Sequence, residues 1–442
     1  MAVTTSVSRA LLLPCRHAPA RVLTRPIPSR SSVRVASSLS SRSAQHEQPN
    51  GSSATTMTTK SAAAPYSTAA STPADTANPH KFVYNVAASY IAKGKSFDPQ
   101  THLFQFNPYN RVQPPKKTGR NKSSRPESGQ DAFFVSRLGP APGEVAVGIA
   151  DGVGGWMDSG VDPADFSHAF CDYMAEAASQ TSSPAAGNGG NEGLTARQLM
   201  QKGYEAVCHD PKITAGGSTA VVGLLTQNGK LEVANLGDSG FIILRLNGVH
   251  ASSEPQTHAF NTPFQLSVVP AIMLMRAAAF GGAQLMDQPK DAEVTRHGLR
   301  HGDVVVFASD GLWDNLFEQD ILRIVSRTMT KAGAWASTER GVQVPTDLKP
   351  YTEVEGQQET EEGGDETKPQ KPPVTLQGAI ATEIVSAAKR ASLDPKLDGP
   401  FAKEVKKYYP HEVWRGGKED DICVVVVVVS EEGVPTPVKA KL

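Results

Sequence analysis

The chain of 442 residues has few cysteines and no long apolar segment. Its longest apolar run, Ile422 to Val429, has eight residues, whereas a helix needs about 20 to cross a bilayer. The four cysteines have no C-x-x-C spacing, which argues against a zinc knuckle and a disulfide framework. We therefore expect neither a membrane span nor a disulfide-stabilised fold in this chain.

Signatures of several enzyme classes are also missing. No G-x-x-x-x-G-K-[ST] motif occurs, which disfavours a P-loop nucleotide hydrolase. Cys15 and Arg21 have the C-x5-R spacing of a cysteine nucleophile site, but no strand precedes them and they lie in a segment that we expect to be removed. The formal net charge of −1 gives no sign of a nucleic-acid partner.

Acidic residues are absent from the first 46 positions, which contain seven arginines and no lysine. An Arg-rich, Ser-rich and acid-free start is typical of an organellar transit peptide. We predict a transit peptide at 1–46 and a disordered linker at 47–79, where Ser, Thr, Ala and Pro dominate. A merely disordered basic tail is the alternative. Without these seven arginines, the chain has 37 basic and 45 acidic residues.

The folded part is predicted at 80–430, followed by a tail at 431–442. β-Branched runs bounded by Gly, Asp or Asn predict strands at 145–150, 219–225, 231–236, 240–246, 304–308 and 422–429. Apolar residues at a spacing of three to four predict helices at 163–179, 195–208 and 378–392. Because strands and helices do not alternate strictly, mainly antiparallel sheets covered by helices are favoured. The acidic, Pro- and Gln-rich stretch at about 341–373 is predicted to be a disordered insert.

Acidic residues stand beside apolar strand-like runs at several places. These residues are Asp131, Asp151, Asp238, Asp310 and Asp420, with Asp314 one turn after Asp310. One such residue is usually part of a turn, but strand ends of a sheet cluster in space. Carboxylates gathered there repel one another unless they are protonated or bind cations. Since hard oxygen ligands select Mg²⁺ or Mn²⁺, the pattern predicts a metal site at one edge of the sheets.

Six short motifs occur in a fixed order along the folded part. They are Gly129-Gln130-Asp131, Ala150-Asp151-Gly152-Val153-Gly154-Gly155, Gly216-Gly217-Ser218-Thr219-Ala220, Leu236-Gly237-Asp238-Ser239-Gly240, Ala308-Ser309-Asp310-Gly311-Leu312-Trp313-Asp314 and Asp420-Asp421-Ile422. This order resembles the type 2C (PPM) metal-dependent protein phosphatases. The segment from His258 to Leu266 resembles their small mitochondrial branch.

The resemblance implies an α+β fold of two packed antiparallel β-sheets flanked by helices, an α-β-β-α sandwich with the metal site at one edge. It implies that Asp151 bridges two cations and that the Gly152 carbonyl binds one of them. Asp310 and Asp420 would be direct ligands, and Asp131 would act through bound water. Asp151, Asp310 and Asp131 would be the catalytic set.

The same resemblance implies a weaker third cation at Asp238 and Asp314, together with Asp310. The implied reaction is hydrolysis of phosphoserine and phosphothreonine by a water that bridges two Mg²⁺ or Mn²⁺ ions. Two alternatives stay open: a catalytically weak pseudophosphatase that acts as a binding module, and a hydrolase of small phosphoesters. We expect phosphoprotein substrates, no nucleic acid, a monomer, and a location in the mitochondrial matrix, with the chloroplast as the alternative.

The chain departs from the usual family pattern at three positions. Gln130 stands where glutamate is usual, and Asp421 stands where asparagine is usual, which adds charge near the site. Val153 replaces the histidine of the commoner Asp-Gly-His-Gly-Gly motif, which is thought to protonate the leaving group. The phosphate-binding arginine is not placed by the motifs, and Arg120 and Arg125 are both candidates.

Overall fold

The structure is a computed structural model that describes residues 81–106, 122, 125–139, 143–181, 193–279, 285–339, 341–353 and 374–432. All of them belong to one compact unit, Asp75–Leu442. The predicted transit peptide (1–46) and linker (47–79) lie outside the described residues, as do Arg120 and most of the predicted tail.

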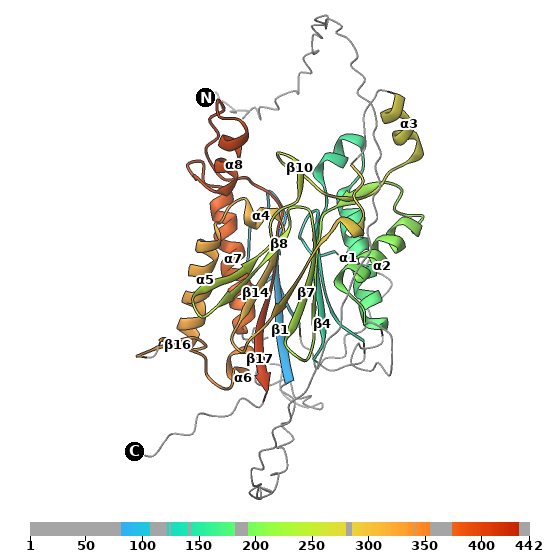
Figure 1. The fold of residues 1–442 in the computed structure, drawn as a ribbon. Coiled ribbons are helices and arrows are strands. Elements are labelled where there is room, and N and C mark those ends of the chain that lie inside the picture. The colour runs from blue at the N-terminus through green and yellow to red at the C-terminus, as the bar shows by residue number, and fades with distance from the viewer. Residues whose placement is uncertain are drawn as a thin grey trace, which may run out of the picture. The chain divides into compact units, whose positions relative to one another are not determined.

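Two antiparallel sheets form the centre of this unit (Figure 1). The six-stranded sheet has the order β2 (Leu103–Phe106), β1 (Lys81–Ile91), β17 (Ile422–Glu432), β14 (Val304–Ala308), β8 (Gly240–Arg245) and β9 (Gly248–Ser252). The five-stranded sheet has the order β13 (Glu293–Gly298), β7 (Lys230–Leu236), β6 (Ala220–Leu225), β4 (Val145–Asp151) and β3 (Asp131–Arg137). The predicted strands are therefore confirmed. β7 and β8, which only three residues join, lie in different sheets.

Pairs of helices cover the outer faces of the sheets (Figure 1). Helices α1 (Pro163–Gln180) and α2 (Ala196–His209) pack on the five-stranded sheet. Helices α5 (Glu318–Ala332) and α7 (Leu376–Ser392) pack on the six-stranded sheet. A third core fills the space between the sheets, where Phe241 and Phe307 contact each other. The predicted α-β-β-α sandwich is confirmed.

The valine run of β17 shows why a central strand has no polar alternation. Both faces of β17 are buried over residues 422–429, one against the helices and one against the other sheet, so each of these eight positions is apolar. Val424, Val426 and Val428 face the helical core, and Val425, Val427 and Val429 face the core between the sheets. No helix among the described residues is long and apolar enough to span a membrane.

Shorter elements complete the unit. They are β5 (Gly216–Ser218), β10 (Thr257–Ala259), β11 (Thr262–Pro263), β12 (Leu266–Val268), β15 (Ala336–Thr338), β16 (Gly341–Gln343), α3 (Ala271–Ala279), α4 (Asp310–Trp313), α6 (Lys349–Thr352), α8 (Pro400–Tyr408) and the 3-10 helices η2 (Gly154–Ser159) and η4 (Pro289–Asp291).

The predicted disordered insert at 341–373 begins too early. Its first part forms strand β16, which pairs with β15, and the short helix α6. Leu348 is only 1% exposed, and the Gln377 side chain donates a hydrogen bond of 3.0 Å to the Thr352 carbonyl. The polar composition of the stretch concealed these few apolar anchors, which pack beside α5 and α7. Residues 354–373 lie outside the described part.

Candidate metal centre

Strand register in the five-stranded sheet places two of the predicted residues opposite each other. Asp131, the first residue of β3, pairs directly with Asp151, the last residue of β4. Antiparallel partners at such a position have Cβ atoms about 5 Å apart. The two aspartates are therefore direct neighbours at one edge of this sheet.

Register in the six-stranded sheet brings three more aspartates to one end. Ala308, the last residue of β14, pairs with Gly240 of β8 on one side and with Val424 of β17 on the other. The chain segments just beyond these strand ends contain Asp238 before β8, Asp310 after β14 and Asp420 before β17.

A cavity of about 450 Å³ lies where these strand ends meet. Five of the seven predicted positions line it: Asp151, Gly152, Asp238, Asp310 and Asp420. Asp131 and Asp314 are absent from its lining, although both interact with residues of the site. Lys93 and Lys418 supply the cationic side chains of the lining among the described residues.

Asp131 is almost completely buried, with 1% of its surface exposed. Its Oδ2 accepts a hydrogen bond of 2.6 Å from the Ser309 hydroxyl, which in turn accepts one of 3.0 Å from the Cys423 N–H. Its other oxygen, Oδ1, has no hydrogen-bond partner. Burial, reinforced by the nearby Asp421 charge, raises the pKa of Asp131 well above its usual range. A buried, unpartnered carboxylate oxygen is suited to a cation or to ordered water.

Asp151 stands on a tightly constrained turn. The Gly152 N–H donates to the Gln130 carbonyl at 3.1 Å, and the Val153 N–H donates to the Gly217 carbonyl at 3.0 Å. A side chain at Gly152 would place its Cβ 2.9 Å from that same Gln130 oxygen, so glycine is required there. Burial, with added repulsion from Asp310, raises the pKa of Asp151 well above its usual range.

The Gly-Gly-Ser-Thr motif supports this turn from the next strand. The Ser218 hydroxyl donates to the Asp151 carbonyl at 2.8 Å, and the Asp151 N–H donates to the Thr219 hydroxyl at 3.3 Å. A Cβ on Gly217 would lie 2.8 Å from the indole nitrogen of Trp156. The sequence analysis assigned no role to this motif. In the structure, its Ser218 and Thr219 position the backbone of Asp151.

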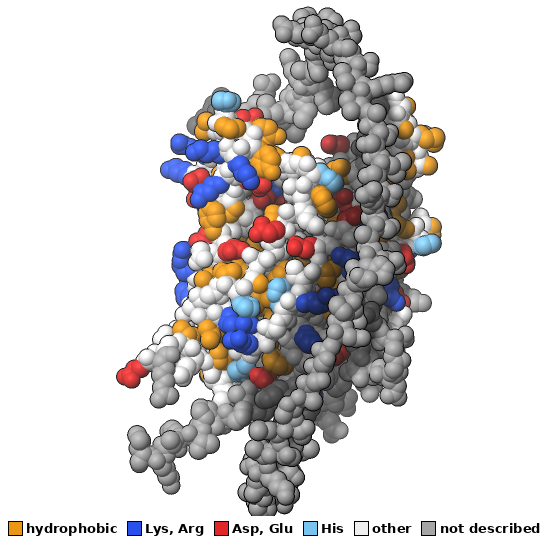
Figure 2. All heavy atoms as spheres, viewed as in Figure 1, with side chains coloured by type: hydrophobic (Ala, Val, Ile, Leu, Met, Phe, Trp, Pro, Cys, Tyr) orange, Lys and Arg blue, Asp and Glu red, His pale blue; other side chains and the backbone are white. Residues whose placement is uncertain are grey.

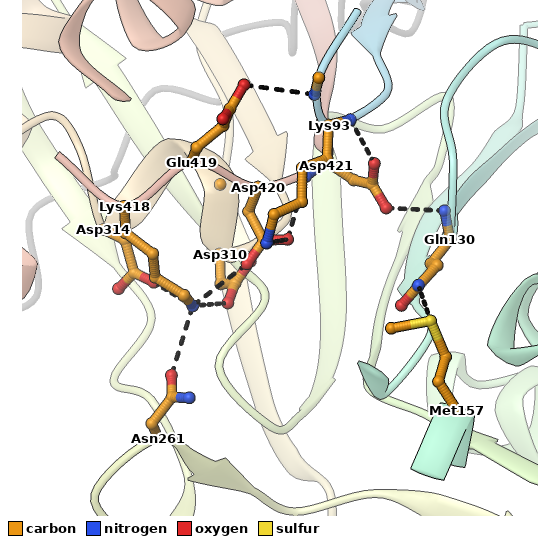
Figure 3. Close-up of polar contacts among 12 residues, drawn as sticks. Lys93, Gln130, Met157, Asn261, Asp310, Asp314, Lys418, Glu419, Asp420 and Asp421 are labelled. Atoms are coloured by element: carbon orange, nitrogen blue, oxygen red, sulfur yellow. Dashed lines mark hydrogen bonds and ion pairs between the residues drawn. The ribbon is translucent and has the colours of Figure 1, made fainter. Parts of the chain in front are cut away.

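Lys418 is a site residue that the sequence analysis missed. Its Nζ donates hydrogen bonds of 2.6 Å to Asp310 Oδ2 and to Asp314 Oδ2, and it lies 3.5 Å from Asp420 Oδ2 (Figure 3). Burial alone would lower its pKa, but the three aspartates outweigh burial and raise the pKa of Lys418 well above its usual range. The sequence contains no signal that separates this lysine from the many surface lysines.

Two further carboxylates of the cluster have raised pKa values. Burial, with repulsion from Asp310, raises the pKa of Asp238 to about 8. Burial also raises the pKa of Asp314 to about 7, even though Lys418 opposes the shift. These shifts express the cost of gathering negative charges in a shielded place, and a bound cation removes that cost.

Asp421 lines the cavity, and its charge acts on the site as expected from sequence, because it helps to raise the pKa of Asp131. Its carboxylate accepts hydrogen bonds from the backbone N–H groups of Lys93 at 2.6 Å and Gln130 at 2.8 Å (Figure 3). It thereby ties the end of β1 to the turn before β3. The Gln130 side chain points to Met157, with 3.2 Å between Nε2 and Sδ (Figure 3).

The expected proton donor and phosphate-binding arginine have no clear counterpart. Val153 lines the cavity, and no histidine does so among the described residues. Arg125 pairs with Asp165 of α1 at 2.8 Å and does not line the cavity. Its Nε is buried and unpartnered.

An aromatic cluster lies beside Asn261, next to helix α8. Asn261 lines the cavity, and its neighbour Phe260 packs against Phe401, Tyr408 and Tyr409 in and beside α8. Helix α8 also contains the basic residues 403, 406 and 407. Figure 2 shows basic side chains gathered at the upper left, where Figure 1 places α8.

The donor set of the cavity fits a hard divalent cation. The lining includes the carboxylates of Asp151, Asp238, Asp310, Asp420 and Asp421, and carboxylate oxygens are ligands that Mg²⁺ and Mn²⁺ prefer. Within the described ranges, however, no three Asp, Glu, His or Cys side chains already surround a single point. Lys418 offers a reason, because it holds oxygens of Asp310 and Asp314 at hydrogen-bond distance.

Comparison with known proteins agrees with the resemblance found in the sequence. The family model for protein phosphatase 2C matches residues 118–349. The chain is 32% identical over 308 residues to "Protein phosphatase 2C homolog 7, mitochondrial" of Saccharomyces cerevisiae, covering 70% of this chain and 76% of that protein. It is 32% identical over 321 residues to "Protein phosphatase PTC7 homolog fig" of Drosophila yakuba, covering 72% and 81%.

Among solved structures, it is similar to the photosystem II phosphatase PBCP, with 24% identity and a TM-score of 0.45 over 68% of this chain and 91% of that chain. The family match spans more than half of the chain, and the two relatives exceed 30% identity over most of their lengths. The chain belongs to the protein phosphatase 2C family.

Proposed function

We propose that this protein is a metal-dependent phosphatase that hydrolyses phosphoserine and phosphothreonine in proteins. The observation that carries the proposal is the convergence of strand-end aspartates from both sheets on one cavity, in a chain of the protein phosphatase 2C family. The aromatic cluster beside Asn261 and the lysines of α8 support a peptide substrate, because they offer stacking and charge to an acidic or phosphorylated chain.

We assign the cation ligands on the basis of this geometry and the family motifs. Asp151 would be shared by two Mg²⁺ or Mn²⁺ ions, and the Gly152 carbonyl would bind one of them. Asp310 and Asp420 would be direct ligands, and the buried Asp131 would act through water. When bound, two such cations lower the pKa of a water and neutralise developing charge on phosphate oxygens.

The chain's own residues prepare this site. Ser309 holds one oxygen of Asp131 and leaves the other unpartnered. Ser218 and Thr219 fix the backbone of Asp151. Cysteine chemistry is disfavoured among the described residues because no cysteine lines the cavity. Cys208 is exposed, whereas Cys171 and Cys423 are buried, and burial raises the pKa of these two thiols well above the usual range.

Chelation tests this function directly. Protein stripped with a chelator should lose turnover of phosphoserine and phosphothreonine peptides and recover it with Mn²⁺ or Mg²⁺. Full turnover in excess chelator, with no metal found by elemental analysis, would overturn the proposal. A small phosphoester cleaved faster than every peptide of a panel would instead support the alternative substrate class.

We propose a mitochondrial location, in the matrix. The acid-free, Arg-rich start supports it, as does the word mitochondrial in the name of the yeast relative. A reporter fused to residues 1–60 should enter mitochondria, and the mature protein should have lost Arg9. A cytosolic reporter would refute the proposal, and import into chloroplasts would support the alternative organelle.

A further inference from the structure

The Lys418 ammonium lies among carboxylates that the family motifs assign to cations. It is 2.6 Å from Asp310 Oδ2 and from Asp314 Oδ2, and 3.5 Å from Asp420 Oδ2. Its side chain is 15% exposed, so solvent screens these contacts weakly. Such short charge-assisted hydrogen bonds are the strong ones.

The backbone of Lys418 is held in place from the far side. Buried Asn315 accepts a hydrogen bond of 3.0 Å from the Lys418 N–H and donates one of 2.8 Å to the Lys418 carbonyl. The same amide nitrogen donates to the Gly311 carbonyl at 3.0 Å, one residue after Asp310. Asn315 therefore fixes the lysine to the same turn that presents Asp310 and Asp314.

Two more groups fix the side chain within the cavity. The side-chain oxygen Oδ1 of Asn261 accepts a hydrogen bond from Nζ at 3.3 Å (Figure 3). The ring of Phe401 lies with its centroid 5.2 Å from Nζ, within the range of a cation–π contact. The ammonium is thus surrounded by partners that suit a cation, and several independent contacts fix its position.

This position coincides with the third cation site that the family resemblance implies. That site was expected at Asp238, Asp310 and Asp314, and Nζ already occupies oxygens of two of these residues. An added divalent ion would have to displace the ammonium from those oxygens. Both cannot bind the same oxygens without close repulsion.

We propose that Lys418 is a built-in cation that replaces a third divalent ion in this protein. The inference rests on the proposed metal-dependent function and adds to it. The protein would hold two exchangeable ions around Asp151. The Lys418 ammonium would balance the charge of Asp314 and bind Asp310 Oδ2. Lys418 is a positioning and charge-balancing residue and takes no part in bond breaking.

The test counts bound ions, with a readout independent of activity. Chelator-stripped full-length protein is titrated with Mn²⁺, and free Mn²⁺ is followed by electron paramagnetic resonance. We expect about two ions for the wild type, about three for Lys418→Gln, and about two for Lys418→Arg, which keeps the charge. Lys93→Gln is the matched control, because Lys93 also lines the cavity but is 58% exposed and lies 3.6 Å from Asp420. It should leave the number of bound ions at about two, because Lys93 has no contact with the oxygens of Asp310 and Asp314 that Lys418 holds.

Several outcomes would overturn the inference. Three ions in the wild type, or equal numbers in the wild type and Lys418→Gln, would show that the lysine replaces nothing. If Lys418→Gln does not fold, as judged by circular dichroism, Asp314→Asn decides. Its ion count should stay at the wild-type number, and a loss of one ion would show that Asp314 holds a metal. No Mn²⁺ binding to the wild type would overturn the proposed function itself.

Discussion

The two sheets contribute unequal halves to the metal centre. The half from the five-stranded sheet, Asp131 and Asp151, has no side-chain cation within hydrogen-bond distance among the described residues, and one Asp131 oxygen is unpartnered. The half from the six-stranded sheet includes Asp310 and Asp314, which share the Lys418 ammonium. A cluster of like charges therefore need not be compensated uniformly. An added cation is needed most where the protein supplies none.

Removal of one carboxylate from either half of the metal centre should have the largest effect on turnover. Asp151→Ala and Asp310→Ala should each lose nearly all phosphopeptide turnover with little loss of fold, because deleting one carboxylate relieves repulsion while metal binding weakens. Steady-state rates at saturating Mn²⁺ and thermal unfolding measure both effects. Asp158→Ala, in exposed η2, is the control. Retention of more than about a tenth of the rate, equivalent to about 1.4 kcal/mol of barrier, would contradict the ligand assignment.

A proton donor placed near Asp151, in the half from the five-stranded sheet, tests whether protonation of the leaving group limits turnover. Val153→His should raise phosphopeptide turnover relative to p-nitrophenyl phosphate by up to about 10²-fold, because alkoxide leaving groups need protonation and nitrophenolate does not. Since a general acid must be protonated, the gain should fade above about pH 6.5. Val153→Asn serves as the polar control. An unchanged ratio of phosphopeptide to p-nitrophenyl phosphate turnover, with Mn²⁺ binding intact, would mean that residue 153 has only a packing role.

A smaller effect should follow from adding charge to the uncompensated half. Gln130→Glu restores the residue usual in the family next to Asp131 and should strengthen Mn²⁺ binding a few-fold through bound water. Calorimetric titration of the stripped protein measures the change. The same substitution at the half-buried Gln201 of α2, which does not line the cavity, is the control. Weaker Mn²⁺ binding in Gln130→Glu would show that this side of the cluster tolerates no further charge.

The smallest effect is expected outside both halves. Deletion of 354–373 should leave stability and turnover nearly unchanged, since each doubling of loop length changes closure by only about 0.6 kcal/mol. Deletion of 341–373 is the matched comparison, because it also removes β16, buried Leu348 and α6. Loss of a buried leucine side chain alone costs about 2–5 kcal/mol. Equal stability of the two deletions in urea would contradict the corrected boundary.

The sequence was sufficient to predict the sandwich and the aspartates. A run such as 422–429, apolar at every position, indicates a strand buried on both faces, and Asp beside a strand indicates its end. It was insufficient for partners brought in by tertiary structure. Lys418 reaches Asp310 across 108 positions of the chain, and Ser309 reaches Asp131 across 178. Composition also misled at 341–353, where a few apolar anchors such as Leu348 outweigh many polar neighbours.

Crystals of the protein grown with Mn²⁺ would show whether two cations share Asp151 while Lys418 keeps its place beside Asp314. Anomalous scattering at the manganese edge should show two peaks that share Asp151, one beside the Gly152 carbonyl and the other beside Asp310 and Asp420. Lys418 should remain on Asp314, without a third peak there. Absence of manganese at Asp151 in an active, Mn²⁺-saturated protein would contradict the account.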